Sequence, residues 1–78
     1  MDIDNLVRMA NRIGDFFAAL PDAHEARAGI AGHLQRFWDP RMRRQIVAHV
    51  DQGGAGLSEV VREAIAANRQ TLAPDGTS

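Results

Sequence analysis

The chain has 78 residues, contains no cysteine and carries a formal net charge of −1. Because cysteine is absent, disulfides, thiolate metal sites, iron–sulfur ligation by this chain and a cysteine nucleophile are excluded. The length suits one small domain, which can build a modest core but not a deep substrate pocket as well. All nine basic residues are arginine, which suits protein interfaces, while the near-neutral charge disfavours a general nucleic-acid binder.

The N-terminal residues lack a basic region followed by an apolar run, so we expect no signal peptide. No apolar stretch approaches the ~20 residues that span a bilayer. The sequence therefore predicts a cytoplasmic chain that has no membrane-embedded part.

The first predicted helix runs from about Asp2 to Leu20. Asp2 or Asp4 can cap its start, and Pro21 ends it because the residue before a proline avoids helical backbone angles. Apolar residues recur at spacings of three and four and form one stripe, namely Leu6, Ala10, Ile13, Phe17 and Leu20. The adjacent Phe16 points about 100° away from Phe17, so it either widens the core or contacts something else.

The second predicted helix runs from Ala23 to Phe37. Asp22 is a suitable N-cap, and Glu25 three residues later completes a capping-box pattern. Gly29 lies beside the apolar stripe, where a missing side chain would allow close approach of another helix. The stripe itself consists of Ala23, Ala26, Ile30, Leu34 and Phe37.

Two further helices are predicted after the Asp39-Pro40 pair, which supplies an N-cap and a first helical residue. One runs to about Asp51 and stops at the glycine run 53–56. The other is capped by Ser58 and runs to about Gln70. No segment alternates with the period of a strand. We therefore predict an all-α fold: a small bundle of about four short helices, a single domain over residues 1–72 and a disordered, flexible C-terminal tail over 73–78.

No catalytic, cofactor-binding or metal-binding motif is recognised in the sequence. His24-Glu25 lacks the second histidine of a zinc-protease helix, because position 28 is alanine. The glycine run has neither the preceding strand nor the lysine that phosphate-binding loops need. Ser58 lacks the second glycine of a nucleophile elbow, so N-capping explains it. We expect a chain that is not an enzyme.

Residues 36–44, here called the arginine-rich junction, hold four arginines and the only tryptophan. Such residue types are enriched in the cores of protein interfaces. Two interpretations stay open: Phe37 and Trp38 close the core while the arginines are solvated, or Trp38 anchors a docking surface whose arginines meet carboxylates of a partner. The candidate partner-binding residues are Phe16, Arg36, Trp38, Arg41, Met42, Arg43 and Arg44.

Three patches of the sequence, residues 9–17, 30–43 and 56–64, carry a resemblance to a known family. The most specific run is Phe-Trp-Asp-Pro-Arg-Met at 37–42, and Met-Ala-Asn-Arg-Ile at 9–13 is fairly specific. On these residues the chain resembles the delta subunit of the soluble NAD-dependent, molybdenum-containing formate dehydrogenases. The likeness covers most of the chain from Asn5 to Leu72.

The resemblance implies a non-catalytic accessory subunit that binds the catalytic alpha subunit and supports assembly, cofactor loading or stability. Other subunits of that complex hold molybdopterin guanine dinucleotide, iron–sulfur clusters and FMN and react with NAD, whereas the delta subunit holds no cofactor. Permanent and transient association are both compatible with the sequence, as are molybdenum and tungsten enzymes. The alternatives are a self-associating helical scaffold or regulatory module, which could be a homo-oligomer in isolation, and a small nucleic-acid-binding domain that uses the arginines of the junction.

Overall fold

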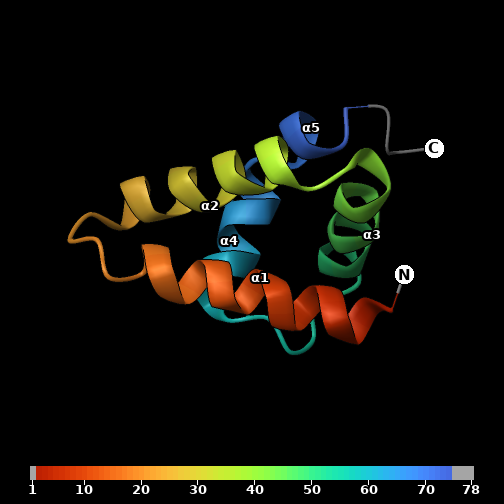
Figure 1. Cartoon of the computed structure of the whole chain (residues 1–78), viewed down its shortest axis with the longest axis horizontal. Coiled ribbons are helices and arrows are strands. Elements are labelled where there is room, and N and C mark those ends of the chain that lie inside the picture. Colours follow the sequence, from red (N-terminus) through yellow and green to blue (C-terminus); the bar gives the residue numbers. More distant parts are fainter. Residues whose placement is uncertain (1, 75–78) are drawn as a thin grey trace.

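A computed structural model describes residues 2–74, and the part of the chain within that range is helical, with no strand (Figure 1). The predicted all-α fold is confirmed. The helices are α1 (Ile3–Phe17), α2 (Ala23–Phe37), α3 (Pro40–Asp51), α4 (Glu59–Ala67) and α5 (Arg69–Leu72). α1 and α2 run side by side and are joined by a short turn, and α4 packs against both of them. No helix in the described range is long and apolar enough to cross a membrane.

Aspartate side chains cap the first three helices, at the positions that the sequence indicates. The carboxylate of Asp2 accepts a hydrogen bond from the backbone N–H of Asp4, Asp22 accepts one from His24, and Asp39 accepts one from Met42. These bonds satisfy N–H groups that have no partner within a helix. The starts of the three helices are therefore fixed by local sequence.

The end of α1 differs from the prediction, because the helix stops at Phe17 rather than at Leu20. The N–H of Leu20 donates to the carbonyl of Phe17 at 3.0 Å, which forms a turn in place of a further helical turn. Leu20 is consequently exposed and does not extend the buried stripe. The proline that follows Leu20 disfavours a helical conformation at Leu20.

The burial of Phe37 was predicted wrongly, since this side chain is 69 % exposed whereas Trp38 is only 5 % exposed. The buried row of α2 continues in steps of four residues through Ile30 and Leu34 to Trp38. Trp38 ends the helix with an extended backbone (φ −96°, ψ 136°), and its N–H donates to the Leu34 carbonyl. The tryptophan is therefore part of the core at the junction between α2 and α3.

The loop between α3 and α4 is held by a clamp from α1. The side-chain amide of Asn11 donates to the carbonyl of Gly56 and accepts from the N–H of Ser58, both at 2.9 Å. The backbone at Gly54 (φ 67°) and Gly56 (φ 85°) lies in the left-handed region that glycine tolerates best. Ser58 stands at the N-cap position of α4, but its hydroxyl makes no capping bond, so the predicted capping role of that side chain is wrong.

The fourth predicted helix is divided in two at Asn68. Its side-chain amide donates to the carbonyl of Ala64 at 2.8 Å, and its backbone (φ −118°, ψ 26°) leaves the helical region. The short α5 follows and brings Leu72 and Ala73 into the core. The tail was predicted to begin at residue 73, but Ala73 is buried; residues 75–78 of that predicted tail lie outside the described range.

The core contains only apolar residues within the described range, so the ion pairs lie at the surface. Members of all five helices and of the α3–α4 loop contribute to it. The fully buried large side chains are Leu6, Ile30, Leu34, Ile46, Val61, Ile65 and Leu72.

An exposed ion pair joins α3 to α5 and makes the stability of the fold depend on pH. Arg69 donates two hydrogen bonds to the Asp51 carboxylate, at 3.0 and 2.6 Å, and these bonds lower the pKa of Asp51 below its ordinary value of 3.8. A depressed pKa in the folded state stabilises the fold above the ordinary pKa, and the effect is lost as pH falls through the lowered one. We expect Asp51→Asn to be slightly less stable than the unmodified chain at pH ~7. This difference in stability should vanish once the pH has fallen below the lowered pKa of Asp51.

Urea denaturation of the unmodified chain and of Asp51→Asn, from neutral pH down to below the lowered pKa of Asp51, would check the expectation. A difference in stability that stays constant between neutral and acid pH would contradict it, because the ion pair requires an ionised carboxylate.

Candidate partner-binding surface

Two phenylalanine side chains are exposed although their residue type is usually buried. Phe16, in the last turn of α1, is 75 % exposed, and Phe37, the last residue of α2, is 69 % exposed. Leu20 is the third large apolar residue exposed within the described range, at 41 %. Two exposed phenylalanines on one small domain indicate an interaction site more strongly than a single exposed apolar residue such as Leu20 does.

The two exposed phenylalanines are linked by a row of aromatic rings. Phe16 contacts Phe17 in an edge-to-face arrangement, with ring centroids 5.1 Å apart. Phe17 lies 6.4 Å from His33, and His33 lies 4.7 Å from Phe37 in a tilted arrangement. These separations are typical of favourable aromatic pairs, so each ring positions the next. We call Ile13, Phe16, Phe17, His33 and Phe37 the aromatic face.

Helical spacing and one glycine place the rings of α2. Gly29, His33 and Phe37 are four residues apart and therefore lie on one side of the helix. A side chain at Gly29 would come within 2.5 Å of the Phe17 ring, so the ring rests directly on the backbone of α2. The prediction that Gly29 allows a close approach is confirmed, and the approaching group is Phe17 of α1.

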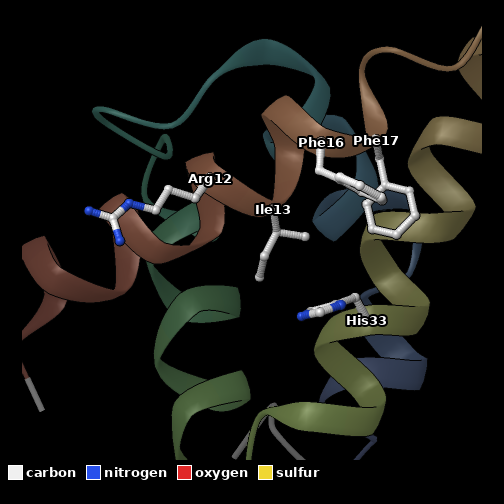
Figure 2. A pocket seen from close by; sticks show the side chains of 5 residues that line it. All are labelled: Arg12, Ile13, Phe16, Phe17 and His33. Atoms are coloured by element: carbon white, nitrogen blue, oxygen red, sulfur yellow. The ribbon is translucent and has the colours of Figure 1, made fainter.

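Two neighbouring hollows lie along the aromatic face. One has a volume of about 350 Å³ and is bordered by Ile13, Phe16 and Arg12, and Figure 2 shows the isoleucine and histidine side chains reaching into the space between α1 and α2. The other has a volume of about 310 Å³ and is bordered by Arg36 and Phe37. Phe17 and His33 line both hollows, so the two adjoin, and an arginine borders each of them. We call the two hollows together the groove. Arrangements of this kind receive apolar side chains of another molecule.

A comparison with protein families identifies the family of the chain. The family model of the NADH-dependent formate dehydrogenase delta subunit, FdsD, matches residues 5–65, which is most of the chain. The chain belongs to the FdsD family. Comparisons with curated proteins and with solved structures gave no match. The matched range of this FdsD chain includes the whole aromatic face, and the resemblance noted in the sequence is confirmed.

The arginine-rich junction of this FdsD chain is not a single surface. Arg36 borders the groove of the aromatic face, whereas Arg44 lines a different hollow beside Leu72 and Pro74. Arg41 is exposed and forms no ion pair with any acid of the described range. The predicted cluster is therefore divided between separate parts of the surface.

Three members of the junction have structural roles in the chain itself. Trp38 is buried, which confirms the interpretation in which it closes the core; its predicted contact with a partner stays a prediction. Met42 is half-buried and packs against the core. The guanidinium of Arg43 donates to the carbonyl of Gln35 at 3.1 Å, which satisfies one of the unpaired carbonyls at the end of α2.

The candidate surface contains residues that sequence reasoning had assigned elsewhere. Phe37 was assigned to the core but is exposed, and His33 was not singled out as a partner-binding candidate. Ile13 and Phe17 were assigned to the apolar stripe of the first helix; they do pack against the core, and they line the hollows as well. The repeat of Gly29, His33 and Phe37 at four-residue spacing was a signal for a second row on α2. The sequence left open whether Phe16 widens the core or contacts something else, and in the structure its side chain lies on the surface.

Two kinds of inorganic site can be checked against the residues of this FdsD chain, an iron–sulfur cluster and a metal ion held by side chains. The sequence has no cysteine to hold an iron–sulfur cluster. Residues 2–74 contain no group of three or more histidine, aspartate or glutamate side chains placed to hold a metal ion.

Proposed function

We propose that this chain is a non-catalytic accessory subunit that binds the catalytic alpha subunit of a formate dehydrogenase through the aromatic face. It supports assembly, cofactor loading or stability of the complex and holds none of the cofactors itself. The observation that supports the proposal is the exposed aromatic row, in a chain whose family is that of a formate dehydrogenase subunit.

Energetic considerations favour this surface. Exposed phenylalanine rings gain free energy when another apolar surface covers them, at ~25 cal/mol per Å² of apolar area removed from water. Here the rings are already held by one another and by Gly29, so binding costs little side-chain entropy. A few such anchors supply most of the binding energy in a protein interface.

The test is co-purification of the full chain with the catalytic subunit from its host, using the double variant Phe16→Ala/Phe37→Ala. We expect binding to weaken about 30-fold or more, because both exposed anchors are lost. The variant should keep its thermal stability, since neither side chain is buried. Leu20→Ala removes an exposed apolar side chain that lines neither hollow and is the matched control, expected to bind like the unmodified chain.

Undiminished co-purification of the double variant would contradict the proposal. Light scattering that finds a stable homo-oligomer, which the double variant loses, would favour a self-associating module instead.

A further inference from the structure

The charged residues that line the two hollows of the aromatic face are both arginine. Arg12 borders one hollow and Arg36 borders the other, and no acidic residue lines either. The ion pairs of the described range are Arg27–Glu63 and Asp51–Arg69, so neither Arg12 nor Arg36 has an acidic partner within that range. Figure 2 shows the guanidinium of Arg12 extending away from the rings. A groove with apolar rings and an arginine at the border of each hollow is complementary to apolar groups flanked by carboxylates.

The backbone of the fold restricts the form of the occupant. The described range has no strand, so an extended segment finds no sheet edge to pair with at this surface. A segment that enters an apolar groove must satisfy its own N–H and C=O groups, which a helix does internally. The two adjoining hollows, of about 350 and 310 Å³, would accept apolar side chains from successive turns of one helix face.

A second copy of this chain fits the face poorly. A two-fold dimer apposes the same patch from both copies. Such a dimer would appose two patches that each carry Arg12 and Arg36 and whose hollows are lined by no carboxylate. Like charges placed together in an interface are unfavourable. The aromatic face therefore favours a different molecule.

We infer that the occupant of the aromatic face is an amphipathic helix of the formate dehydrogenase complex that carries apolar residues along one side and aspartate or glutamate at its flanks. The inference rests on the proposed function and adds the chemistry of the partner segment. The apolar side of that helix fills the groove beside Phe16 and Phe37, and its carboxylates meet Arg12 and Arg36.

Photo-crosslinking identifies the occupant directly. Benzoylphenylalanine replaces Phe16 in one full-length sample and Phe37 in another, and each is irradiated with the host's complex purified without this subunit. We expect both positions to crosslink one helical segment that has acidic residues within a turn of its apolar ones. A crosslink to a second copy of this chain, or to a segment without acidic residues, would overturn the inference.

Charge variants test the same point in solution. Arg12→Gln/Arg36→Gln should bind the same complex about tenfold more weakly and with a smaller salt dependence than the unmodified chain. Arg41→Gln/Arg44→Gln changes the net charge equally but affects no residue of the groove, so its affinity should stay unchanged.

The outcomes separate the inference from the proposed function. If both charge variants bind equally well, the inference of an acidic partner helix is wrong, whereas the proposed docking function is unaffected. Failure of the unmodified chain to bind the complex overturns the docking function and the inference with it. Binding to vesicles of anionic phospholipid, in place of the complex, has the same consequence.

Discussion

Replacing Trp38 by alanine is expected to lower the free energy of unfolding of the isolated chain by about 3–5 kcal/mol. The side chain is 5 % exposed and belongs to the core where α2 passes into α3. Its removal costs the transfer free energy of a large apolar group and leaves a cavity that the neighbouring helices fill only partly. Small domains have about 5–15 kcal/mol of stability in total, so the loss is severe.

Urea denaturation followed by far-ultraviolet circular dichroism would measure this change, since the variant has no tryptophan fluorescence. Phe37→Ala is the matched control: it removes a neighbouring aromatic side chain that is 69 % exposed, and it should change stability little. Trp38→Phe retains an aromatic ring and should fall between the two. Equal stability of Trp38→Ala and Phe37→Ala would show that the tryptophan is not a core residue.

Gly14→Ala should destabilise the chain by about 1–3 kcal/mol, although alanine is the better helix former. Gly14 is buried where α1 crosses α4, and an added Cβ would overlap with Cγ2 of Val61. Val61 is fully buried and β-branched, so its side chain has little freedom to move away. The overlap therefore outweighs the gain in helix propensity, which is at most ~1 kcal/mol.

Gly32→Ala makes the same chemical change at a site where the structure leaves room. No atom lies within 4 Å of a Cβ at Gly32, so we expect a gain in stability of up to ~1 kcal/mol. Thermal melts of the two variants should shift in opposite directions. A stabilising Gly14→Ala would mean that α1 and α4 do not pack closely at this point.

Local signals were sufficient to predict most of the helices. Asp22 and Asp39 cap α2 and α3, and these two helices have the predicted bounds. Prolines and glycines act within a few residues of their own position, so their effect can be read without the tertiary structure. The division at Asn68 was missed because it depends on a side-chain bond to Ala64 that competes with continued helix.

The candidate surface was harder to predict, because it depends on how separate helices pack. After Leu34, spacings of three and four residues are both helical, so Phe37 and Trp38 were equally compatible with the buried stripe. The structure decides between them: the backbone becomes extended at Trp38, whose side chain belongs to the core. Likewise, the contact between Phe17 and Gly29 exists only once α1 lies on α2. Phe16 could be selected as a candidate from the sequence, but the row of rings could not.

Binding through the aromatic face determines how many sites one copy of the chain can occupy. α4 packs against both α1 and α2. The aromatic face consists of residues of α1 and α2 that line the two hollows. In the docking function proposed here, each copy binds through its aromatic face and occupies a single site. An excess of the chain therefore saturates its sites at one copy each and does not cross-link neighbouring complexes, so its dose–response curve should rise to a plateau without a decline at high concentration.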